Sequence, residues 1–227
     1  MLKKTLLSLL LVSSASLLLF SCENFPSTGS RPPEVIRVAC VGDSITYGAG
    51  IEGRWMNSYP SQLGVLLGKG WEVRNFGVNN ATMLKRGFYP YWQTREFKEA
   101  LAYLPHVVII KLGTNDARPW NWRYKDDYTR DYLVLIESFQ ALETRPKIWL
   151  CTPAPAYRGK GGGPDRVIQE EVIPLIRRIA RRTGLPVIDL NKALLGRKDL
   201  FPDGVHPDAQ GAGLIADMVY EAIAGKQ

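Results

Sequence analysis

Three side chains from opposite ends of the chain have the types that nucleophilic acyl transfer requires. Ser44 follows Gly42-Asp43 at the end of a strand-like run, whereas Asp203 and His206 lie three residues apart near the C-terminus. A serine hydroxyl, an imidazole that removes its proton and a carboxylate that orients the imidazole together form such a set. We therefore predict Ser44, His206 and Asp203 as catalytic residues, with one turn of backbone aiming the carboxylate at the ring.

Five short apolar runs predict buried β-strands, and amphipathic patterns between them predict helices. The strands are expected at 35–41, 71–76, 106–112, 147–151 and 186–190. Helices are expected after Pro60, after Thr94, around 132–139, over 167–183 with a kink at Pro174, and over 207–224. This alternation predicts an α/β fold: a three-layer α/β/α sandwich around a five-stranded parallel sheet of flavodoxin-like order 2-1-3-4-5.

Four polar signatures follow the ends of these predicted strands. They are Gly42-Asp43-Ser44, Asn75-Phe76-Gly77, Gly113-Thr114-Asn115-Asp116 and Asp203-Gly204-Val205-His206-Pro207. In an open parallel sheet, ligands bind beyond the carboxyl ends of the strands. The predicted fold therefore brings all four signatures to one edge of the sheet.

These four blocks, in this order, resemble those of the SGNH (GDSL-type) hydrolases over residues 35–224. Ile45 stands where the first block commonly has Leu, and Asn80 stands where the second block often has another glycine. The Gly-x-Ser-x-Gly elbow of the α/β-hydrolases is absent around Ser44. The resemblance implies ester hydrolysis, with an oxyanion hole formed by the Ser44 N–H, the Gly77 N–H and the side-chain amide of Asn115.

Other residues at these strand ends have structural interpretations. We expect Asp43 to bind backbone amides in its own turn, Asp116 to cap a helix or turn, and His106 to be structural. Ser44, Asn115 and Asp203 also have structural alternatives, as a helix cap and as turn residues. The acidic residues and His206 could be imagined as metal ligands, but one histidine without zinc-type spacing makes this a poor alternative. We predict no metal and no cofactor.

Aromatic residues follow the second and third blocks, and flat aromatic faces suit sugar rings. We predict Tyr91, Trp92, Trp120 and Trp122 as substrate contacts, with loop packing as the equal alternative. The cations nearby in sequence either receive an acidic sugar or are solvated: Arg54, Arg118, Arg123 and Lys125.

The overall pattern resembles carbohydrate-acting acetylesterases among the SGNH hydrolases. It implies hydrolysis of a short-chain ester, an acetyl group above all, on a small molecule or a glycan. A lysophospholipase or thioesterase of the same family is the first alternative. The second is a non-catalytic glycan-binding lipoprotein.

The N-terminal residues predict export. Lys3 and Lys4 precede a Leu-rich run that is too short for a typical membrane span. Residues 1–21 are therefore predicted to be a signal peptide. Leu19-Phe20-Ser21-Cys22 resembles a bacterial lipobox, which implies cleavage before Cys22 and lipid attachment to it. An uncleaved anchor and an ordinary signal peptide remain alternatives. Residues 22–33 are predicted to form a flexible tether and 34–227 the hydrolase domain, held at a membrane face or otherwise secreted.

Charge and cysteine content limit the remaining partners. The formal net charge of +7 falls to +5 when Lys3 and Lys4 leave with the signal peptide. Four arginines between 177 and 182 are expected to form a solvated helix face, so no nucleic-acid partner is predicted. Membrane contact is expected only through the lipid, and the oligomeric state stays open. Cys40 and Cys151 lie in strands that the predicted order separates, too far apart for a disulfide.

Overall fold

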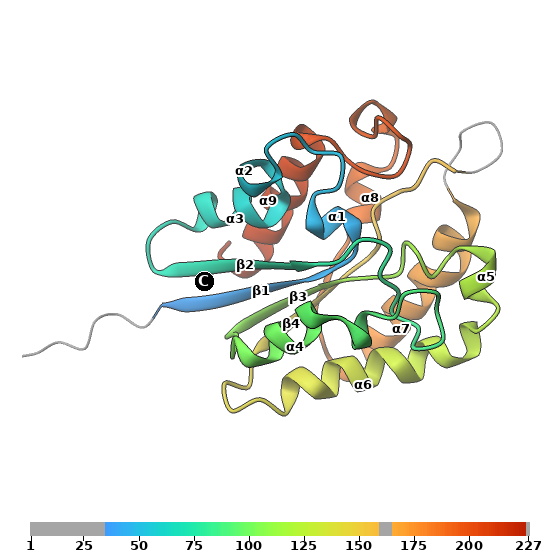
Figure 1. Cartoon of the computed structure of the whole chain (residues 1–227), viewed down its shortest axis with the longest axis horizontal. Helices are drawn as coiled ribbons and strands as arrows, with labels where there is room; N and C mark the ends of the chain where they lie inside the picture. The colour runs from blue at the N-terminus through green and yellow to red at the C-terminus, as the bar shows by residue number, and fades with distance from the viewer. Residues whose placement is uncertain (1–34, 159–164, 226–227) are drawn as a thin grey trace, which may run out of the picture. The chain divides into compact units, whose positions relative to one another are not determined.

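The fold is built on a five-stranded parallel sheet in the order β2-β1-β3-β4-β5. The computed structural model describes residues 35–158 and 165–225. Its strands are β1 (Ile36–Gly42), β2 (Trp71–Gly77), β3 (Val107–Lys111), β4 (Lys147–Cys151) and β5 (Val187–Ile188). All neighbouring strands are parallel, as Figure 1 shows. The predicted sheet order is confirmed, and only the last strand is much shorter than the sequence indicated.

Each central strand contributes to two hydrophobic cores because successive side chains point to opposite faces. Val38 and Cys40 of β1 pack in one core, whereas Ala39 and Val41 pack in the other. The four residues 107–110 of β3 alternate in the same way. This is why the strands read as continuous apolar runs, as expected of a sheet that is covered on both sides.

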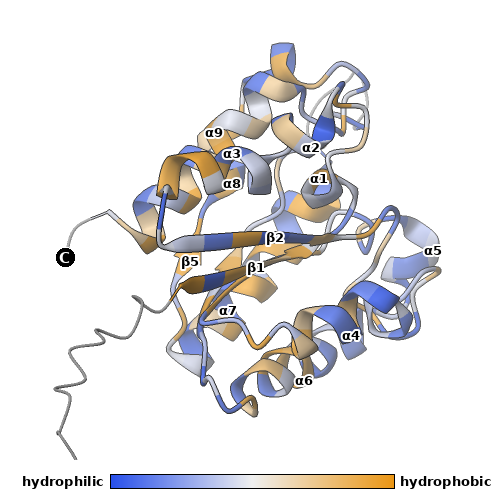
Figure 2. Ribbon diagram, turned by 60° about the vertical axis from the view of Figure 1, so that its left-hand side comes forward, coloured by the Kyte–Doolittle hydropathy of each residue, from blue (hydrophilic) through white to orange (hydrophobic). Residues whose placement is uncertain are grey.

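Helices cover both faces of the sheet, which gives the three predicted layers (Figures 1 and 2). One face carries α1 (Ser44–Tyr47), α2 (Arg54–Asn57), α3 (Tyr59–Leu67), α8 (Leu190–Leu194) and α9 (Ala209–Ile223). The other carries α4 (Arg95–Ala102), α6 (Tyr128–Gln140) and α7 (Ile173–Thr183), with α5 (Pro119–Trp122) beside them. Among the described residues, three short 3₁₀ helices lie in the connections, at Tyr91–Gln93, Lys125–Asp127 and Lys198–Leu200.

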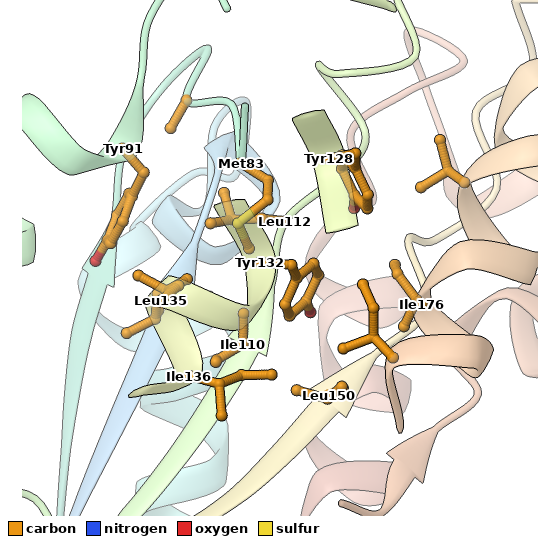
Figure 3. Close-up of a cluster of buried hydrophobic side chains, with 14 of the residues drawn as sticks. Met83, Tyr91, Ile110, Leu112, Tyr128, Tyr132, Leu135, Ile136, Leu150 and Ile176 are labelled. Atoms are coloured by element: carbon orange, nitrogen blue, oxygen red, sulfur yellow. The ribbon is translucent and has the colours of Figure 1, made fainter. Parts of the chain in front are cut away.

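Helix α6 supplies much of the core on its face of the sheet (Figure 3). Tyr132 and Leu135 of this helix are fully buried, together with Ile110 of β3 and Leu150 of β4. The ring of Tyr128 lies 5.8 Å from that of Tyr132 in an edge-on arrangement. These large side chains hold α6 against the sheet and so support the loops that follow β3.

The segment predicted as one kinked helix is helical throughout, with an irregular turn just before Pro174. Residues Ile168–Val172 form a π-helical turn, and α7 begins at Ile173. Pro174, which has no backbone N–H to donate, follows this wider turn closely, and the helix continues past it to Thr183. Gly184 ends α7 with a φ of 70°, as the sequence indicated.

Several predictions concern residues that the structure does not cover. The signal peptide, the tether and the lipid-attachment residue Cys22 lie outside the described residues. Within 35–158 and 165–225, no helix is long and apolar enough to cross a membrane. Cys40 and Cys151 are buried and unpaired, and β3 separates their strands.

Candidate active site

The nucleophile candidate lies at the tight junction between β1 and α1. The Asp43 side chain caps α1 by accepting a 3.0 Å hydrogen bond from the Ile45 N–H, which confirms its expected structural role. Gly42 is required here, because a Cβ would lie 2.0 Å from the Thr46 hydroxyl oxygen. Ser44 follows as the first residue of α1, where a backbone N–H has no acceptor within the helix.

A buried ion pair holds this junction against the end of β3. Lys111 Nζ lies 2.8 Å and 3.0 Å from the two carboxylate oxygens of Asp43, and both side chains are fully buried. The same ammonium donates to the Thr114 hydroxyl at 3.1 Å. Asp43 immediately precedes Ser44, and Thr114 immediately precedes Asn115. Lys111 therefore fixes the nucleophile candidate relative to the predicted oxyanion donor.

The structure brings the two predicted C-terminal residues to Ser44. His206 Nε2 lies 2.8 Å from Ser44 Oγ, and His206 Nδ1 lies 2.6 Å from Asp203 Oδ2. Asp203 Oδ1 also accepts from the N–H groups of Val205 and His206, at 2.8 Å and 2.7 Å. One carboxylate thus orders both the turn and the ring, as the three-residue spacing predicted.

The protonation of this pair follows from its hydrogen bonds. Partial burial opposes ionisation of Asp203, but hydrogen bonds from the His206 ring and from two backbone N–H groups outweigh it and lower its pKa to about 2. An ionised carboxylate has no proton to donate, so His206 Nδ1 carries the hydrogen of that contact. His206 Nε2 is then left to accept the proton of the Ser44 hydroxyl.

Of the predicted oxyanion donors, Gly77 differs from expectation. Asn115 donates one amide hydrogen to the Ala81 carbonyl at 3.0 Å, which leaves the second available. The Gly77 N–H instead donates to Asn75 Oδ1 at 2.9 Å, and Gly77 is buried. A Cβ there would lie 2.2 Å from the Tyr47 nitrogen. This geometry does not support Gly77 as an oxyanion donor: its missing Cβ allows close packing against α1.

Asn80, three residues after Gly77, lies next to Asn115 instead. Its φ is 64°, the left-handed conformation that glycine favours, and it lines a cavity together with Asn115. The hydrogen bond from Asn115 to Ala81 holds the two asparagines next to each other. Within the described part of the chain, the Asn80 N–H has no hydrogen-bond acceptor. The sequence signal was the asparagine itself, since this residue tolerates positive φ better than most.

Asp116 connects the loop after β3 with the loop after β2. Its fully buried carboxylate accepts from the N–H groups of Met83 at 3.0 Å and Leu84 at 2.8 Å. Burial raises its pKa to about 7, against the opposing effect of those two N–H groups. The carboxylate was expected to cap a helix or turn, and it does bind backbone N–H groups, but in a loop more than thirty residues away.

A cavity of about 640 Å³ adjoins the candidate oxyanion donors. The described residues that line it are Asn80, Arg86, Phe88, Asn115, Arg118, Trp120, Asn121, Arg123 and Tyr124. Asn121 accepts from the Phe88 N–H at 2.7 Å, which joins its two walls. Phe88 was not predicted as a contact, although it lies three residues before Tyr91, which was.

The four predicted aromatic contacts occupy different environments. Tyr91 is fully buried and donates its hydroxyl hydrogen to the Phe76 carbonyl, so it is not a surface for substrate. Trp122 is also buried, with its indole N–H 2.9 Å from Glu171. Trp92 is half-buried and donates to the Met83 carbonyl. All three side chains pack within the protein. The prediction of a substrate contact is therefore wrong for the buried residues Tyr91 and Trp122. Of the four predicted contacts, Trp120 alone lines the cavity.

The second histidine lies just before β3, at the opposite end of this strand from the candidate active site. His106 Nδ1 accepts from the Arg37 N–H at 3.0 Å, next to the start of β3. Among the residues that the structure describes, no group of three or more His, Cys, Asp or Glu side chains could hold a metal ion.

Comparison with known proteins identifies relatives of this chain. The family model of the GDSL-like lipase/acylhydrolase family matches residues 40–214. An acetylxylan esterase of Xylanibacter ruminicola is 40% identical over 208 residues, which cover 84% of this chain and 43% of that protein. This chain therefore spans less than half of that relative.

Solved structures share the fold at lower identity. The aryl esterase of M. smegmatis superposes with a TM-score of 0.64 at 20% identity, covering 82% of this chain and 99% of the other. An acetyl xylan esterase, AlAXEase, gives a TM-score of 0.62 at 23% identity, with coverage of 83% and 100%. A two-domain esterase active on acetylated mannans gives 0.62 at 20% identity, with coverage of 84% and 50%.

The sheet order and the helices on both of its faces define the class of protein as a three-layer α/β fold. Within that class, the chain belongs to the GDSL-like lipase/acylhydrolase family. The resemblance noted in the four sequence blocks is thereby confirmed.

Removing the Lys111 charge is expected to destabilise the fold strongly. Lys111→Met leaves the buried Asp43 carboxylate without its countercharge, which should lower the free energy of unfolding by about 3–5 kcal/mol. The double variant Lys111→Met/Asp43→Asn removes both charges and should recover part of that loss. Urea unfolding at pH 7 measures both effects.

A matched control is Arg95→Gln, which breaks an exposed ion pair with Glu99. It should change stability by less than about 0.5 kcal/mol. A Lys111→Met protein as stable as this control would contradict the role given to the buried pair.

Proposed function

We propose that this protein hydrolyses short-chain esters, acetyl esters above all, on a carbohydrate by a serine mechanism. The observation that carries the proposal is the continuous contact from Ser44 Oγ through His206 to Asp203, at 2.8 Å and 2.6 Å. The choice of an acetylated carbohydrate draws support from an acetylxylan esterase that is 40% identical to this chain. An acetyl xylan esterase and an esterase active on acetylated mannans share the fold, which is consistent with this choice.

In the first step, Ser44 Oγ attacks the ester carbonyl carbon while its proton moves to His206 Nε2. Collapse of the tetrahedral intermediate breaks the bond to the sugar oxygen, and His206 returns the proton to that oxygen. A water molecule then attacks the acetyl-Ser44 ester, again giving a proton to His206, and acetate leaves as Ser44 regains its hydrogen. Asp203 keeps the ring oriented and stabilises the imidazolium throughout.

The developing oxyanion requires hydrogen-bond donors. The Ser44 N–H and the free hydrogen of the Asn115 amide supply two. We assign the third to the Asn80 N–H in place of Gly77, because the Gly77 N–H is already bound to Asn75. Donors of this kind act mainly on kcat, since the charge they stabilise develops in the transition state.

Replacement of the nucleophile tests the mechanism directly. Ser44→Ala is expected to lower kcat on p-nitrophenyl acetate and on acetylated xylan by about 10⁴-fold or more. A panel of p-nitrophenyl esters of increasing chain length should show highest kcat/KM for acetate. Unchanged hydrolysis by Ser44→Ala would refute the nucleophile assignment, and a preference for long acyl chains would favour a lysophospholipase or thioesterase. Absence of hydrolysis by the wild type would favour a glycan-binding lipoprotein.

Backbone conformation at residue 80 tests the third donor. Asn80→Gly keeps the N–H and the positive φ, so kcat should stay near the wild-type value. Asn80→Val disfavours positive φ and should lower kcat by about 10–100-fold with little change in KM. Circular dichroism and unfolding curves verify that both variants fold. Equal kcat for the two variants would exclude the Asn80 N–H as a donor.

We also propose that the protein is exported and anchored through a lipid on Cys22, on the strength of the lipobox-like residues alone. In a bacterial host, the full chain should partition into the detergent phase of a Triton X-114 extract. Cys22→Ser should move it to the aqueous phase, and Cys40→Ser serves as the matched control. Detergent partitioning of Cys22→Ser equal to that of the wild type would refute lipidation at this residue.

A further inference from the structure

The cavity beside the candidate oxyanion donors carries an excess of positive charge. Arg86, Arg118 and Arg123 line it, and none of the described residues that line it is acidic. Arg86 has a carboxylate partner, Asp127, at 3.4 Å, but Arg130 binds the same carboxylate at 3.2 Å. Within the described residues, Arg118 and Arg123 have no carboxylate within ion-pair distance.

Aromatic rings of the cavity hold these guanidinium groups in place. The guanidinium carbon of Arg118 lies 5.4 Å from the ring centre of Trp120. Those of Arg86 and Arg123 lie 4.1 Å and 4.7 Å from the ring centre of Tyr124. A guanidinium against an aromatic face keeps the N–H groups along its edge free for hydrogen bonds. The cavity therefore presents ordered donors that match the paired oxygens of a carboxylate.

A fourth arginine, Arg158, lies near Arg118 but has a carboxylate partner of its own. Arg158 donates to the Thr114 carbonyl at 3.1 Å, directly before Asn115, and pairs with Asp165 at 3.0 Å. Burial and the nearby charge of Arg158 lower the pKa of Arg118, against the opposing effect of the Asp165 carboxylate. Bringing these cations together without equal negative charge is unfavourable, and a bound anion would offset that repulsion.

We propose that this cavity binds the carboxylate of a uronic acid, so that the preferred substrate is an acetylated glycan with acidic sugars close to the ester. Arg118 and Arg123 supply the ionic contacts, and the exposed rings of Phe88 and Trp120 pack against sugar faces. The inference rests on the proposed esterase function and specifies its substrate class. It assigns to Arg118 and Arg123 the selection of substrate, not a part in the bond-breaking steps.

Two matched polymers test this inference. One is glucuronoxylan that has been chemically acetylated, and the other is the same xylan with its carboxyl groups reduced to alcohols before acetylation to the same degree. Acetate release should give a kcat/KM about tenfold higher for the carboxylated polymer at low salt. The difference should shrink as NaCl is raised from 20 to 500 mM, because the ionic contacts are screened.

Variants test whether the preference for the carboxylated polymer arises from the arginines of the cavity. The double variant Arg118→Gln/Arg123→Gln should reduce the kcat/KM ratio between the two polymers to near one, mainly through KM for the carboxylated polymer. Arg95→Gln, an exposed arginine of α4, is the matched control and should keep the wild-type ratio. A third polymer, acetylated and bearing sulfate esters in place of carboxylates, separates the two kinds of anion.

The outcomes separate this inference from the function on which it rests. If the wild type hydrolyses p-nitrophenyl acetate but treats both polymers alike, the uronate inference is wrong and the esterase function stands. If p-nitrophenyl acetate is not hydrolysed, the proposed function itself fails. A preference confined to the sulfated polymer, or one retained by the double variant, would also overturn the assignment of a carboxylate to these arginines.

Discussion

The active-site edge of this sheet depends on one buried ammonium group. All three hydrogens of Lys111 Nζ have acceptors: the two oxygens of Asp43 and the hydroxyl of Thr114. These contacts join the ends of β1 and β3 directly below Ser44 and Asn115. The separation between the nucleophile candidate and an oxyanion donor is therefore set inside the protein, where neither salt nor solvent competes.

The loops above this pair are held by side chains of the segment that follows β3. Asn115 binds the Ala81 carbonyl, Asp116 binds the N–H groups of Met83 and Leu84, and Asn121 binds the Phe88 N–H. The loop after β2 is thus attached along its length to the loop after β3. The proposed oxyanion donors and the walls of the cavity consequently form one hydrogen-bonded unit, so the proposed substrate contacts are fixed relative to Ser44 and His206.

Sequence patterns predicted what depends on periodicity, topology and short spacing. They indicated the five strands, their order and the meeting of Ser44 with Asp203 and His206. They missed the buried ion pair of Lys111, because a single lysine at the end of an apolar strand is ordinarily exposed to solvent. Gly77 was misjudged because a glycine gives no sign of where its N–H points. An aromatic run likewise does not reveal that Tyr91 faces the core whereas Phe88 faces solvent.

The contact between Ser44 and His206 joins residues that are 162 positions apart, whereas Asp203 and His206 share one turn. The proposed base and the carboxylate that orients it are thus paired locally, and a single long-range contact completes the proposed catalytic set. That contact requires β1 to be already in the sheet and the entry to α9 to be seated upon it. Recovery of the proposed hydrolysis during refolding would therefore report the last stage of assembly, and partly folded chains would contain all the proposed catalytic side chains without activity.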